Sequence, residues 1–383
     1  MNYQRLGDYI REVDVRNREL KVTKPRGINI DKHFMPSVAN VIGTDLSTYK
    51  LVSKKQFACN LMHVGRDEKI PMAMQTDDNL IIVSPAYFVF EISQTEALLP
   101  EYLMMWFSRP EFDRNAWFYT DADVRGGMDK SSFMDMTLSI PSITRQREIV
   151  SEYETLTNRI NLNEQMIQHL EATAQSIYRK MFVDGIDKEN LPKGWNKGTL
   201  GDFGIVITGK TPSTLDAHNF GDYMPFVTIP DMHDGFYVVN TERMLSRKGV
   251  KSQAKKTIPK DAICVSCIGT SGLVVITPQE CQTNQQINTI IPNNPNALYY
   301  IYMICCDMEQ VISEYGIGGA VLNNLNKNDF EKLPAIIPSE GTLKESSNKI
   351  KPLFDLIHLY QIETSKLKEL QSLQLAKMGN LKQ

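Results

Sequence analysis

The sequence predicts a mixed α/β (α+β) chain in which two tandem globular domains are separated by two long helices packed as an antiparallel coiled coil. Three observations predict this architecture: a heptad seam runs unbroken through 145–182, a second copy of that seam ends the chain, and strand-like segments precede both. The copies give the chain a pseudo-twofold internal repeat. The expected boundaries are 1–143 for the first domain, 144–184 for the first helix, 185–342 for the second domain and 343–383 for the second helix.

The first globular region alternates β-branched and aromatic segments with polar turns. Residues 6–26 begin as a short strand or helix and continue as polar structure. Because Pro is favoured at the first position of a helix, Pro100 indicates a helix over 98–108. The expected strands are 51–52, 57–59, 80–83, 87–90 and 136–140, with a polar loop over 121–130.

The first long helix presents apolar residues at alternating steps of three and four, which places them on one narrow face. No Gly or Pro interrupts it, so it forms a single helix of roughly 57 Å at 1.5 Å per residue. Asn163 lies on this face: either the seam tolerates it, or it pairs across the helices and fixes their register. The expected interface residues are Leu156, Ile160, Asn163, Ile167, Leu170, Ile177, Leu353, Ile357, Tyr360 and Leu367.

In the second globular region Gly185 closes the preceding helix, since Gly supplies a left-handed cap. The segments 262–268 and 273–277 predict a hairpin around Gly269 and Gly272. Other expected elements are strands over 203–208, 223–229 and 287–292, a helix over 298–314 and a polar loop over 323–328.

The repeat is visible in the sequence itself. A shift of 197 positions without a gap places Phe133 on Phe330 and 140–142 on the identical 337–339. It also places apolar residues of the first helix, most of them on the seam, on identical residues of the second: Leu156 on Leu353, Ile160 on Ile357, Leu162 on Leu359, Leu170 on Leu367 and Met181 on Met378. The chain is therefore a tandem duplication of a globular region followed by a helix.

Composition favours an ordinary globular protein, with 42% hydrophobic and 23% charged residues in 383. The sequence shows neither a signal peptide nor a membrane-spanning run, so we expect a cytoplasmic protein whose six cysteines are reduced. The net charge of −3 argues against nonspecific coating of nucleic acid. However, 243–260 holds seven cations and no anion, which is either a solvated face or a local surface for phosphates.

Two motifs resemble known sites without fitting them. The segment 204–211 matches the phosphate-loop pattern G-x-x-x-x-G-K-[ST], but its four intervening residues are β-branched and favour a strand. Cys264 and Cys267 have the spacing of half a zinc site, but a second close pair of ligands is missing. The six histidines form no catalytic motif, and motifs of amino-methyltransferases are absent. We expect no bound metal and no catalytic residues in this chain.

Several short motifs, in a fixed order, resemble those of one family. They are Ile140-Pro141 with Gln146 and Ile149, then Leu191-Pro192-Lys193-Gly194-Trp195, Leu200-Gly201-Asp202, 209–213, Thr283-Asn284-Gln285-Gln286 and Gly318-Gly319. Together with the domain-helix-domain-helix order, they resemble the specificity subunit of type I restriction-modification systems. The resemblance covers essentially the whole chain, although the first domain lacks the Leu-Pro-x-Gly-Trp opening.

The resemblance implies a non-catalytic subunit in which each globular region is a target-recognition domain for one half of an asymmetric, bipartite site in double-stranded DNA. It also implies that two methyltransferase subunits dock on the helices, and that restriction and translocation belong to further subunits. S-adenosylmethionine, ATP and Mg²⁺ are expected on those partners and no cofactor on this chain.

The residues expected to contact DNA are cations for phosphates and guanine, and amides or hydroxyls for base edges or phosphates. In the first domain they are Lys54, Lys55, Arg66, Lys69, Arg125 and Lys130. In the second domain they are Lys210, Thr211, Ser213, Arg243, Arg247, Lys248, Lys251, Lys255, Lys256, Asn284, Gln285, Gln286, Asn323 and Asn324. Thr283–Gln286 and Asn323-Asn324 are alternatively turn residues. Two other functions remain as alternatives: a coiled-coil scaffold that binds only proteins, and a P-loop NTPase that uses Lys210.

Overall fold

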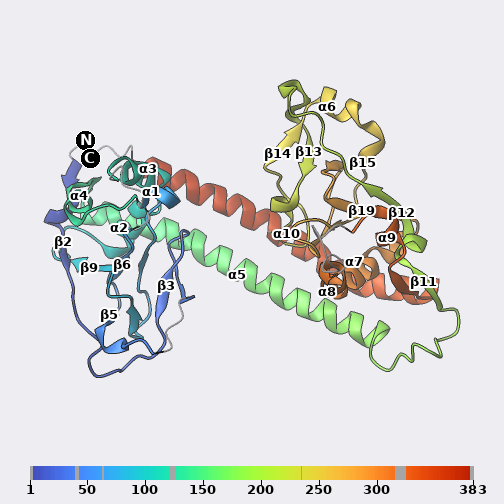
Figure 1. Ribbon diagram of the computed structural model, residues 1–383, viewed down its shortest axis with the longest axis horizontal. Helices are drawn as coiled ribbons and strands as arrows, with labels where there is room; N and C mark the ends of the chain where they lie inside the picture. The colour runs from blue at the N-terminus through green and yellow to red at the C-terminus, as the bar shows by residue number, and fades with distance from the viewer. Residues whose placement is uncertain are drawn as a thin grey trace. The chain divides into compact units, whose positions relative to one another are not determined.

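The computed structural model describes residues 3–38, 43–62, 64–120, 126–233, 235–314 and 325–379 (Figure 1). The chain divides into two compact units. Unit 1 comprises Met1–Arg159 with Leu367–Gln383, and unit 2 comprises Ile160–Lys366. Each unit contains a globular region and part of both long helices, α5 (Ile143–Phe182) and α10 (Glu340–Met378). None of the described helices combines the length and the apolar character needed to cross a bilayer.

Unit 1 is a mixed α/β region built around aromatic residues such as Phe57, Phe90 and Phe133, which are fully buried. Its elements, in chain order, are β1 Tyr3–Arg5, η1 Leu6–Asp8, β2 Ile10–Glu12, β3 Arg26–Ile28, β4 Phe34–Pro36, η2 Leu46–Thr48, β5 Lys50–Val52, β6 Phe57–Cys59, α1 Val64–Asp67, β7 Met72–Met74, β8 Ile81–Val83, β9 Phe88–Ile92, α2 Pro100–Phe107, α3 Pro110–Phe118, α4 Lys130–Asp135 and β10 Thr137–Ser139. The strands and the helix expected here are confirmed.

Unit 2 is also a mixed α/β region, and its elements surround a larger core that includes Phe330 and Phe354. They are β11 Asn196–Thr199, η3 Leu200–Phe203, β12 Gly204–Thr208, η4 Ala217–Asn219, β13 Phe220–Val227, η5 Ile229–Met232, β14 Arg243–Leu245, α6 Arg247–Ser252, η6 Ala254–Lys256, β15 Thr257–Ile258, β16 Ile263–Ser266, β17 Val274–Ile276, β18 Cys281–Thr283, β19 Ile287–Pro292, η7 Pro295–Ala297, α7 Leu298–Asp307, α8 Glu309–Glu314, α9 Lys327–Glu331 and β20 Pro334–Ile337. The hairpin expected around Gly269 and Gly272 is confirmed as the antiparallel pair β16–β17.

The duplication extends to strand order and to individual hydrogen bonds. One sheet of unit 1 has the order β2-β9-β6-β7, and one sheet of unit 2 has the corresponding order β12-β19-β16-β17. The Tyr102 hydroxyl donates to the Ser139 carbonyl at 2.9 Å, and the Tyr300 hydroxyl donates to the Ile336 carbonyl at 2.7 Å. Since 139 and 336 are 197 positions apart, the repeat inferred from sequence is also a structural repeat.

The long helices pack antiparallel within each unit. In unit 1, the Gln374 side-chain amide donates to the Ile149 carbonyl at 3.1 Å, and that of Gln371 donates to the Thr157 hydroxyl at 2.7 Å. In unit 2, the Asn163 amide nitrogen donates to Glu363 at 3.1 Å, and Asn163 is 1% exposed. The alternative in which Asn163 pairs across the helices is thus the one that the structure contains. Ile160 and Ile357 are buried, as the heptad pattern predicts.

Two secondary-structure predictions for unit 2 were wrong in detail. The segment 298–314 forms two helices, α7 and α8, instead of one. The polar segment 326–328 is the start of helix α9, because the Asn326 side chain caps it by accepting from the Asp329 amide at 3.1 Å. Phe330, in this helix, is fully buried. Polar residues at a helix start look like a loop in a sequence, since the same side chains favour both.

Candidate nucleic-acid interface

The basic segment 243–260 folds into β14, α6, η6 and β15, and this series of short elements was not predicted. Leu245 and Ile258 are fully buried and hold its two ends on the sheet β14-β13-β18-β15. Ser246 caps α6 by accepting a hydrogen bond from the Gly249 amide at 3.1 Å. The polar side chains are left to face solvent: Arg243, Arg247, Lys248, Lys251, Lys255 and Lys260 are exposed, and Lys256 is half-buried.

One carboxylate compensates this positive charge. The Lys248 ammonium lies 2.6 Å from Asp216, which also contacts His218 at 3.1 Å. The hydrogen bond from Lys248 holds the pKa of Asp216 below its usual value. The other cations of the segment form no ion pair with any described residue. The segment therefore presents a surface whose positive charge is largely uncompensated.

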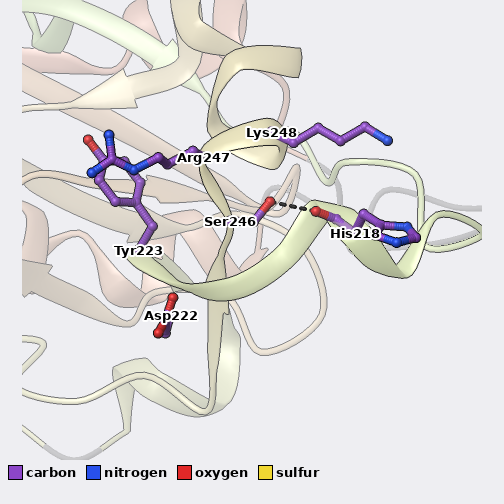
Figure 2. A pocket seen from close by; sticks show the side chains of 6 residues that line it. All are labelled: His218, Asp222, Tyr223, Ser246, Arg247 and Lys248. Carbon is purple, nitrogen blue, oxygen red and sulfur yellow. Dashed lines mark hydrogen bonds between the residues drawn. The ribbon is translucent and has the colours of Figure 1, made fainter.

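Two arginines of the segment stack on aromatic rings. The guanidinium carbon of Arg247 lies 4.5 Å from the centroid of the Tyr223 ring, and that of Arg243 lies 4.2 Å from the centroid of Phe220. Figure 2 shows the Arg247 side chain over Tyr223, while Lys248 and His218 lie on the other side of Ser246. The Ser246 hydroxyl donates to the His218 carbonyl at 2.5 Å, so the start of α6 is tied to η4. One shallow concavity is lined by His218, Asp222, Tyr223, Ser246, Arg247 and Lys248.

The buried side-chain amide of Gln282 is hydrogen-bonded to residues of the basic segment. The Gln282 side chain, on β18, is fully buried and accepts from the Gln253 side chain at 2.9 Å. Its nitrogen is 3.0 Å from the Thr257 hydroxyl and 3.3 Å from the Val250 carbonyl. Gln253 also donates to the Lys210 carbonyl at 2.7 Å. These hydrogen bonds hold the backbone of α6 and η6 in place, so the cations of both helices lie on a hydrogen-bonded frame.

The loop after β12 joins this surface. The Lys210 amide donates to the Thr283 carbonyl at 2.9 Å, and the Gly209 amide donates to the Ile287 carbonyl at 3.1 Å. These amides are consequently not directed at one anion, as a phosphate loop requires. The Thr211 hydroxyl donates to the Gln285 side chain at 2.7 Å, so two predicted residues are in contact. Lys210 and Ser213 are exposed.

The predicted amide residues Asn284, Gln285 and Gln286 differ in their exposure to solvent. Asn284 is 7% exposed, and its side chain donates to Gln286 at 2.9 Å, so it serves the turn between β18 and β19. Gln286 is half-buried, and Gln285 is exposed. For Asn284 the geometry favours a turn residue, the alternative that the sequence left open. Asn323, Asn324 and Arg125 lie outside the described residues.

The cations predicted in the first domain are mostly neutralised. Four of them have a carboxylate partner: Lys54 lies 3.0 Å from Asp78, Lys55 lies 3.4 Å from Glu101, Arg66 lies 2.7 Å from Asp67, and Lys130 pairs with Glu12. Lys69 is half-buried. This domain therefore lacks a clear equivalent of the basic segment among the residues that were predicted.

Sequence reasoning missed three other cations of unit 1. Arg18, Lys24 and Arg26 are exposed and form no ion pair with another described residue. Lys24 and Arg26 flank Pro25, which forms a parallel β-bridge with Ile82. In unit 2, strand β13 likewise pairs in parallel with β18. The sequence feature that could have indicated these cations is the run Lys24-Pro25-Arg26, because no acidic residue lies between residues 20 and 30.

The cysteine pair has a core role. Cys264 lies in β16 and Cys267 directly follows that strand; both are buried, and the Cys264 sulfur lies 3.3 Å from the Thr289 hydroxyl. Burial raises the pKa of Cys264 to about 12 and that of Cys267 to about 11, which disfavours the thiolates that zinc requires. Within the described part of the chain, no three His, Cys, Asp or Glu residues are grouped as metal ligands.

Gly249 offers a test of whether the position of α6 matters. A Cβ atom there would lie 2.0 Å from the Asn219 carbonyl oxygen, so Gly249→Ala must displace the helix. We expect faster amide exchange across 243–258 and a DNA affinity reduced on the order of tenfold, because the displaced cations lose their fixed geometry. Gly341→Ala is the control, since its nearest neighbour is Ser339 Oγ at 4.0 Å. Equal DNA affinity in both variants would contradict a role for α6.

Comparisons with known proteins found a family model, curated relatives and a solved structure to which this chain is similar. Residues 192–372 match the family model of the type I restriction modification DNA specificity domain. The specificity subunit of the type I restriction enzyme HindI from Haemophilus influenzae is 28% identical over 372 residues, covering 78% of this chain and 80% of that protein. The MjaIX specificity subunit of Methanocaldococcus jannaschii is 27% identical over 176 residues, covering 45% of this chain and 40% of that protein. The S subunit of a type I restriction-modification system from M. genitalium shares the fold with a TM-score of 0.61 at 11% identity, covering 100% of this chain and 96% of that one.

Proposed function

We infer the function of this chain from its family: the chain belongs to the specificity subunits of type I restriction-modification systems. It supplies the DNA sequence specificity of such a system and is a recognition subunit without catalytic activity of its own. The observation that best supports direct DNA contact is the basic segment 243–260. Its cations lie on a hydrogen-bonded frame within the part of the chain that matches the DNA specificity domain.

We propose that residues 1–143 and 185–342 are two target-recognition domains, each reading one half of an asymmetric, bipartite site in double-stranded DNA. The repeated sheet order supports this reading, because two copies of one scaffold suggest one kind of task performed twice. The uncompensated cations differ between the copies, Arg18, Lys24 and Arg26 in one and the basic segment in the other. Different contact surfaces on related scaffolds would give two different half-sites.

The role can be tested with purified components. The chain and its cognate methyltransferase subunit are mixed with plasmid DNA and labelled S-adenosylmethionine. We expect methyl transfer to DNA only when both proteins are present, since this chain supplies the sequence specificity and the partner the chemistry. Methyl transfer by the methyltransferase alone, at the same sites and rate, would contradict the proposed role.

We further propose that the two long helices dock methyltransferase subunits, and that restriction subunits join this assembly in the cytoplasm. Besides the buried seam, the helices carry large apolar side chains on their outer faces. In unit 2 these are Leu162, Met166, Leu356 and Leu359, which are 55%, 41%, 42% and 61% exposed. Apolar residues at such spacing on a solvent-facing helix are typical of a surface that another protein covers. Partner subunits would bring S-adenosylmethionine, ATP and Mg²⁺.

The docking proposal predicts the behaviour of a double variant, Leu162→Glu with Met166→Glu. Two carboxylates on adjacent turns of α5 would have to be desolvated in the interface, so we expect co-purification with the methyltransferase subunit to be lost. The isolated chain should retain its melting temperature, because both positions face solvent. Leu215→Glu is the matched control, since Leu215 is 98% exposed on a loop. Intact co-purification of the double variant would remove this face of α5 from the interface.

A further inference from the structure

The two arginines that stack on aromatic rings differ chemically from the lysines beside them. Arg243 and Arg247 have guanidinium carbons 4.2 Å and 4.5 Å from the centroids of Phe220 and Tyr223. Both rings belong to β13, and β13 pairs with β14 through Phe220 and Leu245. A stacked guanidinium is held in one plane, while a lysine ammonium on its flexible stem remains a mobile point charge. The stacks therefore give these two side chains an orientation as well as a charge.

The N–H donors of both arginines remain available to a ligand. Neither guanidinium forms an ion pair with any described residue. Two carboxylates lie in the same region, but Asp216 contacts Lys248 and His218, and Asp222 makes no salt bridge with a described cation. In Figure 2 the Asp222 side chain points away from the Arg247 guanidinium. Each ring lies close to one guanidinium carbon, and the guanidinium N–H groups of neither arginine donate a hydrogen bond to a described residue.

The backbone that carries these arginines is also fixed. Arg247 follows the helix cap Ser246, whose hydroxyl binds the His218 carbonyl at 2.5 Å, and Arg243 lies in a paired strand. Gln282 secures the far end of α6 through the Val250 carbonyl at 3.3 Å. A side chain that discriminates between bases must be positioned by its surroundings, because a mobile donor reaches many acceptors.

We propose that Arg247, oriented by Tyr223, and Arg243, oriented by Phe220, read guanine base edges in the half-site of the second domain. The O6 and N7 acceptors of guanine in the major groove match the parallel donors of a guanidinium, and each such pair discriminates by about 1–3 kcal/mol. Lys251, Lys255 and Lys256 bind phosphates in the same complex and contribute affinity without sequence preference. This inference rests on the proposed function and specifies the bases that the second domain recognises.

The test uses the complex of the chain with its methyltransferase subunit and a set of duplexes. Each base pair of the half-site assigned to the second domain is replaced in turn, and the loss of affinity is measured for the native chain and for Arg247→Ala. In the native complex, replacement of one G·C pair should cost about 5- to 150-fold. In Arg247→Ala that single penalty should disappear, while the penalties at other positions remain.

Two further variants separate base reading from simpler roles. Lys251→Ala should weaken binding to all duplexes by the same factor and leave the G·C penalty unchanged. Tyr223→Phe should keep the penalty because it keeps the ring, whereas Tyr223→Leu should reduce it. A half-site without G·C pairs would overturn the proposal, and so would a uniform loss in Arg247→Ala with every penalty preserved. In either case the native complex would still bind its own site selectively. Absence of any sequence preference in the native complex would instead refute the proposed function.

Discussion

Exchange of residues 185–342 for the matching region of a relative with a different target should change one half of the recognised DNA site completely and leave the other half unchanged. The reason is that the segment carries its own four-stranded sheets and the whole basic segment, while the core residues that α5 and α10 contribute, such as Phe354, stay native. The helices α5 and α10, which would stay native apart from the first turn of α10, preserve the seam on which both units depend. The measurement is the sequence motif methylated by the chimera with its methyltransferase.

The control is the reciprocal exchange of residues 1–143, which should change the other half-site. A folded chimera that methylates the native motif would contradict modular recognition. Loss of both half-sites together, in a chimera that still assembles with the methyltransferase, would contradict it as well.

Reversal of two charges, Lys255→Glu with Lys256→Glu, should weaken binding to all DNA sequences. Each cation that neutralises a phosphate contributes a slope of about −0.9 in a plot of log affinity against log salt. We therefore expect the slope to become shallower by about 1.8 and the affinity at physiological salt to fall on the order of 10- to 100-fold. Neither lysine has a carboxylate partner among the described residues, so no compensating ion pair is lost.

A matched pair of lysines outside the basic segment provides the control for this reversal. Lys193 and Lys197 belong to the same unit, and Lys197 is already paired with Glu189 at 3.1 Å. Lys193→Glu with Lys197→Glu should leave the salt slope unaltered. If the reversal at Lys255 and Lys256 also left the slope unaltered, these residues would not belong to the interface.

The helices and the duplication were predictable because their signals are long or repeated. A heptad seam repeats the same apolar preference many times along one helix, so the helix is predicted strongly. The duplication is equally clear, because Phe133 and Phe330, which are equivalent in the repeat, are both fully buried. Short elements carry little signal of their own. Helix α6 has six residues, and its sequence of cations reads as a solvated loop until Ser246 and the buried Leu245 are recognised as its anchors.

The candidate site was predictable in its charge but not in its contacts. Residues that lie close in sequence revealed the basic segment, whereas the stack of Arg247 on Tyr223 joins positions 24 residues apart through strand pairing. In the first domain, sequence could not reveal that Lys54 and Lys55 are neutralised by Asp78 and Glu101. Ion pairs of this kind depend on tertiary structure, so counts of local charge overestimate the cations available to phosphates.

The most direct test of the central claim is single-molecule sequencing of methylated bases in DNA from a host that expresses this chain with its methyltransferase subunit. The same host without the chain is the reference. The proposed function predicts a new split motif, with one methylated adenine in each half and unread bases between the halves. Absence of any new motif, although the chain and the methyltransferase form an intact complex, would contradict the role in DNA recognition and favour a scaffold that binds only proteins.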